Sequence, residues 1–253
     1  DPTSHNFDQS NGELAWFNAV TASNPPWTSW TSTTTEISFV GTDGSTFTVI
    51  ARARNKAGTY SVTYASNVFV YDSLAPQTGV TTPANLAFVN AFGSLTGTAG
   101  DLPAVHPASM ATAQVRLKRL SDSYHWNWAL GVGGAWNSGV QTMGAAQGVS
   151  VSATGWNVNA ANLPSGANLT SGASYYVTTA GTDGSNGGGN VEAWGSVRGS
   201  TFTYDDTAPT TAISAPANAA LLKTLGGLAG SGFDAVSIST VQLSVQDISI
   251  TAP

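Results

Sequence analysis

The octapeptide Phe69-Val-Tyr-Asp-Ser-Leu-Ala-Pro76 occurs twice in this chain of 253 residues, and its second copy is Phe202-Thr-Tyr-Asp-Asp-Thr-Ala-Pro209. The match continues beyond the octapeptides without a gap, so residues 69–101 align with residues 202–234 at a constant offset of 133 positions. A constant offset over such a span indicates an internal repeat, and the repeat has the length of a domain rather than of a solenoid unit.

The phase of this repeat predicts the domain organisation. If each octapeptide spans a junction between domains, residues 73–206 form one complete unit. Residues 1–72 then correspond to the closing part of a unit, and residues 207–253 to the opening strands of another. The sequence therefore predicts one whole domain between two partial ones, in a chain that is cut out of register with its own domains.

The composition points to a folded protein with a weakly charged surface. Charged residues make up 9% of the chain, against roughly 25% in an ordinary globular protein. The hydrophobic fraction of 41% is sufficient for a packed core. A net charge of −6 argues against a nucleic-acid partner, which requires clustered Lys and Arg. No run reaches about 18 apolar residues, so we expect no transmembrane segment.

Period-2 alternation of side chains predicts strands at Thr46–Arg54, Ala113–Arg119 and Ser174–Thr179. Shorter signals predict further strands at Tyr60–Tyr64, Asn67–Tyr71, Thr78–Thr82, Phe92–Thr98, Tyr124–Trp128, Gly148–Ala153 and Ser200–Tyr204. Residues 181–190 are expected to form a long turn. No amphipathic helical period is present, so the predicted fold is an all-β sandwich. The side chains expected to face inward are Phe92, Leu95, Val115, Leu117, Trp126, Tyr176 and Phe202.

Together these motifs resemble bacterial Ig-like repeats. The resemblance is carried by Phe47–Asn55 with Ala57-Gly58, by Phe69–Asp101, and by their counterparts Tyr175–Asp183 and Phe202–Asp234. It covers most of the chain and is weak over residues 129–172. It implies tandem Ig-like β-sandwich domains in a large secreted or surface protein, hence an extracellular or cell-surface location. It does not imply one function, because such domains serve as stalks, adhesins and fibre subunits.

The two partial units predict a route to self-association. Each would leave strand edges unpaired and one apolar face half covered, and an exposed edge is a template for pairing with another chain. The residues expected to form the assembly strands are Val241, Leu243, Val245, Phe47, Val49, Phe69 and Tyr71. A head-to-tail homopolymer is the expected partner arrangement, either as separate subunits or as one long continuous array.

Acidic residues near the predicted junctions are candidate Ca²⁺ ligands: Asp72, Asp101, Asp205 and Asp206. The alternative is that they cap turns through their own backbone. Two Gly-Thr-Asp-Gly-Ser segments, at 41–45 and 181–185, are interpreted as turns because they are out of phase with the repeat.

Eight tryptophans leave two interpretations open. Exposed indole rings can stack on sugars, and the candidate glycan contacts are Trp27, Trp136 and Trp194. Alternatively, tryptophans fill sandwich cores, as expected of Trp16, Trp30, Trp126 and Trp156, which occur at comparable points of two units.

No catalytic constellation is apparent in the sequence. Neither a nucleophile elbow nor a phosphate loop nor a zinc motif occurs, and the three histidines are isolated from one another. We therefore expect a protein that is not an enzyme and requires no cofactor other than the candidate Ca²⁺. Two functions from different classes remain: a structural subunit of an extracellular filament, sheath or stalk, or an adhesin or carbohydrate-binding segment of a larger surface protein.

Overall fold

A computed structural model of the chain describes Trp16, Ala19 and residues 29–32, 43–128, 134–195 and 198–248. Over this part the protein is all-β, as the sequence predicts. Its only helical elements there are three single turns of 3-10 helix: η3 (Ala145–Gln147), η4 (Ala160–Asn162) and η5 (Gly166–Asn168). None of the helices described is long and apolar enough to cross a membrane.

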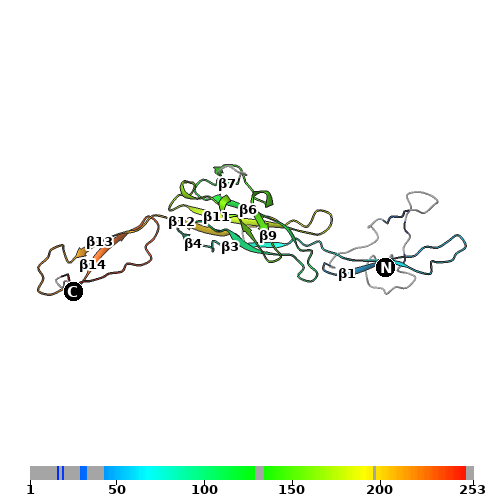
Figure 1. Cartoon of the computed structure of the whole chain (residues 1–253), viewed down its shortest axis with the longest axis horizontal. Helices are drawn as coiled ribbons and strands as arrows, with labels where there is room; N and C mark the ends of the chain where they lie inside the picture. Colours follow the sequence, from blue (N-terminus) through cyan, green and yellow to red (C-terminus); the bar gives the residue numbers. More distant parts are fainter. Residues whose placement is uncertain are drawn as a thin grey trace.

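Two sheets make up the middle of the molecule, here called the central unit (Figure 1). One sheet has the strand order β3 (Gln77–Thr82), β5 (Thr96–Gly100), β10 (Gly155–Val158), β9 (Val149–Val151). The other has the order β4 (Ala87–Val89), β12 (Ser200–Tyr204), β11 (Ser174–Asp183), β6 (Met110–Arg119), β7 (His125–Asn127), β8 (Ala135–Asn137). Neighbouring strands are antiparallel except β4 and β12, which are parallel.

The two sheets share one hydrophobic core. It forms because apolar side chains alternate with polar ones along the strands and all point to the same face. On β11, Tyr175 and Val177 are fully buried, and on β6 Val115 and Leu117 are fully buried. Because side chains of a strand point alternately to its two faces, these odd-numbered positions form one continuous inner face. Trp156 on β10 closes the core from the other sheet and donates its indole N–H to the Gly79 carbonyl at 3.1 Å.

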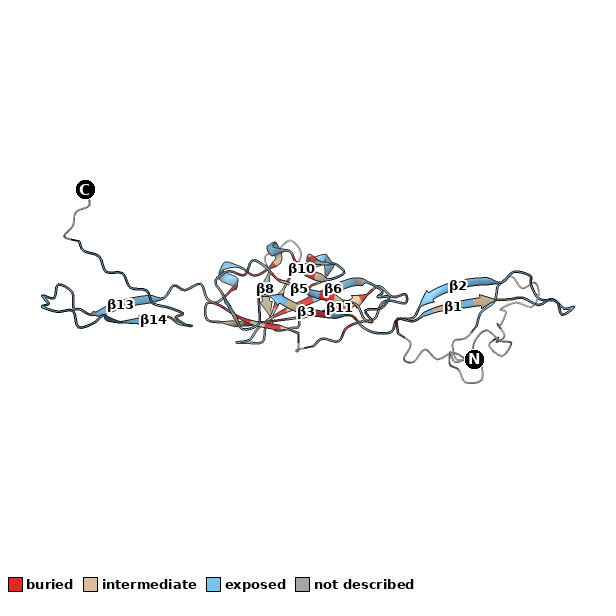
Figure 2. Cartoon of the chain, turned by 90° about the horizontal axis from the view of Figure 1, so that it is seen from below, coloured by how far each residue is buried: buried red, intermediate tan, exposed pale blue. Residues whose placement is uncertain are grey.

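Two hairpins flank the central unit and lie at its opposite ends (Figure 1). One pairs β1 (Thr46–Ala51) with β2 (Ala65–Val70), and the other pairs β13 (Thr210–Ala215) with β14 (Ala229–Phe233). Buried residues are concentrated in the central unit, whereas the strands of both hairpins are largely exposed (Figure 2).

The internal repeat is visible in the strand registers. Every residue pair between β3 and β5 recurs between β13 and β14 exactly one repeat later: Gln77 faces Gly100, and Thr210 faces Phe233. Even the register shift between Val80 and Thr82 recurs, between Ile213 and Ala215. The β1–β2 hairpin likewise reproduces β11–β12, because Phe47 faces Phe69 where Tyr175 faces Phe202.

Several sequence predictions need correction. Tyr176 was expected inside, but the buried tyrosine is its neighbour Tyr175, which points to the opposite face of β11. The strand predicted at Tyr60–Tyr64 is reduced to a single bridge between Tyr60 and Arg54. The turn predicted at residues 181–190 starts later, because β11 continues to Asp183.

The strand predicted at Phe92–Thr98 begins only at Thr96, although Phe92 and Leu95 are buried as expected. Strands β4, β8 and β10 were not anticipated. Each has only three or four residues. Strands β4 and β10 pair with strands distant in sequence, β12 and β5, whereas β8 pairs with the nearby β7.

Candidate functional site

The β13–β14 hairpin exposes positions that its repeat counterpart buries. Leu95 of the central unit is 0% exposed, whereas Leu228, one repeat later, is 42% exposed. Phe92 is buried, and its counterpart Leu225 is exposed. In the central unit Phe92 and Leu95 belong to the same core as Tyr175 of β11 and Phe202 of β12, and Phe92 stacks on Phe202. Among the described residues, the sheet of the β13–β14 hairpin has no counterparts of β11 and β12.

The β1–β2 hairpin shows the reciprocal pattern. Val177 on β11 is 0% exposed, but its counterpart Val49 on β1 is 47% exposed. The ring of Phe47 stacks on Phe69 at 5.5 Å between centroids, as Tyr175 stacks on Phe202 at 5.4 Å. The hairpin therefore preserves the geometry of β11–β12 while keeping apolar surface in contact with solvent.

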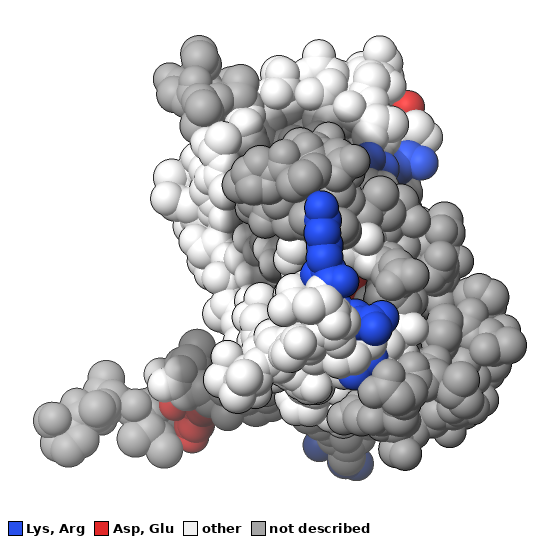
Figure 3. Space-filling view, turned by 90° about the vertical axis from the view of Figure 1, so that its right-hand side faces the viewer, with Lys and Arg blue, Asp and Glu red and all other residues white. Residues whose placement is uncertain are grey.

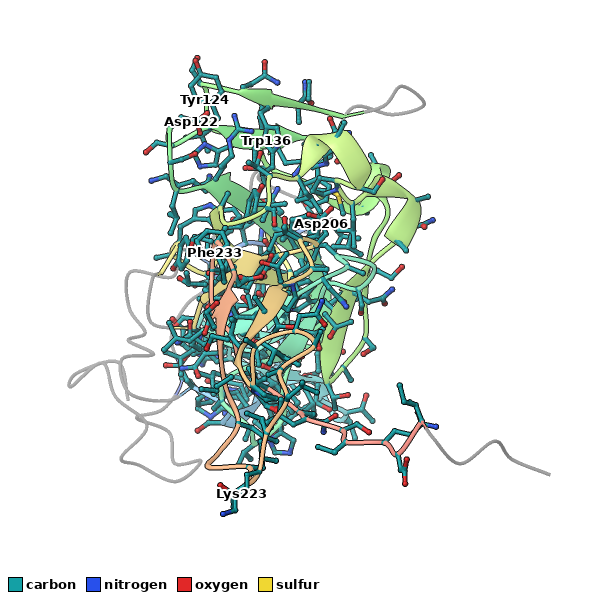
Figure 4. The ribbon with its side chains drawn as sticks, turned by 90° about the vertical axis from the view of Figure 1, so that its left-hand side faces the viewer. Asp122, Tyr124, Trp136, Asp206, Lys223 and Phe233 are labelled. Carbon is teal, nitrogen blue, oxygen red and sulfur yellow. The ribbon has the colours of Figure 1, made fainter. Side chains whose placement is uncertain are left out.

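A third exposed apolar segment follows the β13–β14 hairpin. Val241, Leu243 and Val245 alternate with polar residues, and all three are exposed. Figure 4 looks at the end of the molecule that carries β13–β14, with Phe233 on the hairpin and Lys223 on its connecting loop. Together with the β1–β2 hairpin, these segments place the residues predicted for the assembly strands at both ends of the molecule.

An acidic cluster lies where the β1–β2 hairpin joins the central unit. Asp72, Asp101 and Asp183 each place one carboxylate oxygen within 4.8 Å of the others. One oxygen of Asp72 and one of Asp101 are buried without a hydrogen-bond partner. Burial raises the pKa of Asp72 above its ordinary value, and the carboxylates of Asp101, Asp183 and Asp43 raise it further.

Hydrogen bonds stabilise the charge on Asp183 in this cluster. Burial alone would raise the pKa of Asp183, but donors from Ser185 and Asn190 lower it below the ordinary value. Its Oδ1 atom accepts hydrogen bonds from the Ser185 hydroxyl at 2.6 Å and from the Asn190 backbone N–H at 2.9 Å. Clustered carboxylate oxygens are the ligands that Ca²⁺ prefers, so this is where a hard cation would bind.

The cluster differs from the candidate Ca²⁺ set of the sequence. It contains Asp72 and Asp101 but not Asp205 and Asp206, which bond instead to Ser171 and Tyr204 respectively. The residue that sequence reasoning missed is Asp183, which was interpreted as part of a turn. The Asp183-Gly184 pair indicates a turn in the sequence. Only the structure shows that Asp183 is buried at the end of β11.

The two candidate glycan contacts that the structure describes, Trp136 and Trp194, contact other residues of the same chain. The Trp136 indole N–H donates to the Asn168 carbonyl at 2.7 Å, and its ring packs against Trp126 and Tyr175. The Arg116 guanidinium lies 3.6 Å from the centre of the Trp194 ring and covers one face of it. Trp27 lies outside the described residues.

The tryptophans expected in the core divide into two groups. Trp126 and Trp156 are buried, whereas Trp30 is exposed and Trp16 is half-buried. The Arg52 guanidinium lies 4.0 Å from the centre of the Trp16 ring. The expectation of a core position therefore holds only for the two tryptophans of the central unit.

Comparison of the chain with protein-family models and with curated proteins gives no match.

Proposed function

We propose that the chain is a structural subunit of an extracellular filament, sheath or stalk, assembled head to tail by strand complementation between Ig-like units. The observation that supports this most strongly is the reciprocal exposure of the two hairpins. Among the described residues, the β13–β14 hairpin has the opening strands of a unit without the closing ones, and the β1–β2 hairpin has closing strands.

In the proposed assembly, the β1–β2 hairpin of one copy covers the β13–β14 hairpin of another. The two hairpins would then pack as β11–β12 packs on β3–β5 within the central unit, and Leu225 and Leu228 would meet Phe69. Because the hairpins lie at opposite ends of the molecule, the contact is heterologous and propagates into a filament unless it closes a ring.

The energy available is sufficient for such a contact. Fully burying one Val, Leu or Phe side chain is worth roughly 1.5–3 kcal/mol, while association costs roughly 4–15 kcal/mol. The side chains that would be covered are Val49, Phe69, Leu225, Leu228, Val241, Leu243 and Val245. Even if each gains only half of the full value, their sum is comparable with the cost before any backbone hydrogen bond is counted.

Sedimentation velocity over a range of concentrations tests this proposal. The unmodified chain should form larger species as its concentration rises, and Val49→Asp should remain monomeric because it places a charge in the apolar contact. Val140→Asp is the matched control: Val140 is exposed on the central unit, so this variant should associate like the unmodified chain. If the unmodified chain is a monomer at every concentration, the proposal is wrong.

A further inference from the structure

We infer that residues 241–247 of one copy form the strand next to β1 of a second copy, antiparallel, with Val245 opposite Val49 and Leu243 opposite Ala51. The inference rests on the proposed head-to-tail assembly and adds to it the identity of the donated strand and its register.

The central unit provides the template for this pairing. Its β11 has two neighbours, β12 on one side and β6 on the other. In the antiparallel ladder with β6, Val177 faces Leu117, and Thr179 faces Val115. The β1–β2 hairpin reproduces the pairing of β11 with β12, so β1 corresponds to β11. Among the described residues, the sheet of β1 contains β2 but no counterpart of β6.

Segment 241–247 has the side-chain pattern of β6. On β6 three buried residues alternate along the strand, Ala113, Val115 and Leu117, and the next inward position is the charged Arg119. The later segment contains Val241, Leu243 and Val245 in the same alternation, followed by Asp247. This alignment fixes the register given above.

Two other alignments place a polar side chain at the position of Ala113, which is buried on β6. Extending the offset of 133 puts Gln246 at the position of Ala113, which is buried in the core. Sliding the segment by two residues in the opposite direction puts Ser239 there instead. Among residues 234–248, the described part of the chain after β14, only the alignment that starts with Val241 gives an apolar side chain at all three buried positions.

The chosen alignment requires a shorter connection before the strand than the central unit has. The connection from β14 to residue 241 is shorter than the connection from β5 to the matching position of β6. In the central unit the longer connection contacts the preceding hairpin, where the His106 ring nitrogen Nδ1 lies 2.9 Å from the Gly44 carbonyl. A shorter connection is compatible with the same strand pairing, because residues 101–109 lie outside the β6–β11 ladder.

Cysteine cross-linking tests the register, because the chain contains no native cysteine and each variant oxidised alone measures its own background. Residues directly opposite on antiparallel strands lie within disulfide reach, whereas a two-residue slip moves the two Cα atoms beyond it. We would mix two single variants, Val49→Cys with Val245→Cys, oxidise them gently, and compare the products with those of Val49→Cys mixed with Leu243→Cys. A mixture of Val49→Cys with Ser244→Cys controls for the wrong face of the strand.

The expected result is a cross-linked dimer, twice the 25.7 kDa of the chain, from the mixture containing Val245→Cys and little from the other two. Cross-linking through Leu243→Cys instead would overturn the register while leaving the head-to-tail assembly intact. If no mixture cross-links although sedimentation shows association, the identity of the donated strand is wrong. If nothing cross-links and nothing associates, the proposed function fails as well.

Discussion

Phe202 and Phe69 occupy the same position of the repeat in two different environments. The ring of Phe202 is fully buried and stacks between Phe92, at 4.8 Å, and Tyr175, at 5.4 Å. Phe69 keeps the corresponding contact with Phe47 but remains 37% exposed. Comparing the two phenylalanines therefore shows how much of the stabilisation comes from the ring pair itself and how much from burial in the core of the central unit.

Truncating the two phenylalanines should have very different effects. Phe202→Ala should lower the free energy of unfolding of the central unit by about 3–5 kcal/mol, because it opens a cavity in the core. Phe69→Ala, the matched control, should change it by much less in dilute solution. Urea denaturation followed by tryptophan fluorescence measures both, and equal losses would contradict the assignment of the core to the central unit.

The carboxyl groups of Asp72 and Asp122 should respond to pH in opposite directions. The pKa of Asp72 is raised by burial, so its charged form destabilises the folded state. Stability linked to Asp72 is therefore present at low pH and is lost as the pH rises through the folded pKa. The pKa of Asp122 is lowered by its hydrogen bonds with Arg119, at 2.5 Å, so its contribution is lost as the pH falls.

Two substitutions check these signs at neutral pH. Asp72→Asn should raise the melting temperature, since it removes a charge beside Asp101 and Asp183. Asp122→Asn should lower it slightly, because the ion pair is exposed to solvent. The difference between each variant and the unmodified chain should vanish at low pH. The same comparison is made with Ca²⁺ added. If Asp72→Asn then lowers the melting temperature, the three carboxylates bind the cation, and the charge of Asp72 stabilises the protein when the cation is bound.

At the scale of the element, Glu192 joins β3 to β11. The Glu192 carboxylate is buried and accepts hydrogen bonds from the Thr78 backbone N–H at 3.0 Å, the Thr78 hydroxyl at 2.6 Å and the Gly181 N–H at 3.0 Å. It also forms an ion pair with Arg198. One side chain thereby holds the first strand of the central unit against a strand of the other sheet.

Removing this carboxylate should weaken the contact between the sheets. Glu192→Ala leaves two buried N–H groups without an acceptor, at about 1–3 kcal/mol each. Glu192→Gln keeps one oxygen and should lose less. Chemical denaturation ranks the two variants against the unmodified chain, and an Ala variant as stable as the Gln variant would show that water replaces the carboxylate.

The sequence predicts long strands better than short ones, for a physical reason. Strands β6 and β11 carry their alternation over ten residues each, so their inner face is evident from the sequence. Strand β4 has only three residues and exists because it pairs in parallel with β12, more than a hundred residues later. The predicted acidic site was incomplete for the same reason, because only the tertiary fold brings Asp183 to Asp72.

At the scale of the whole molecule, the low charge of the surface bears on assembly. Seen from the end that carries β1–β2, the described surface is mostly uncharged, with a few Lys and Arg side chains (Figure 3). The proposed contact is apolar and formed by strand pairing. Salt screens charge interactions but not apolar burial, so association should depend only weakly on ionic strength.

Sedimentation at low and high salt measures this dependence. Between about 0.05 M and 0.5 M salt, the concentration at which larger species appear should change little. Dissociation at high salt would indicate that charged groups, rather than the apolar hairpin faces, hold the copies together.

Hydrogen exchange at the backbone amides of residues 241–247 tests the head-to-tail assembly most directly. In dilute solution these amides should exchange rapidly, because the segment is exposed and forms no strand within its own chain. At high concentration their exchange should slow markedly as they pair with β1 of another copy, while amides of β6 stay protected throughout. Rapid exchange of residues 241–247 at every concentration would contradict strand complementation.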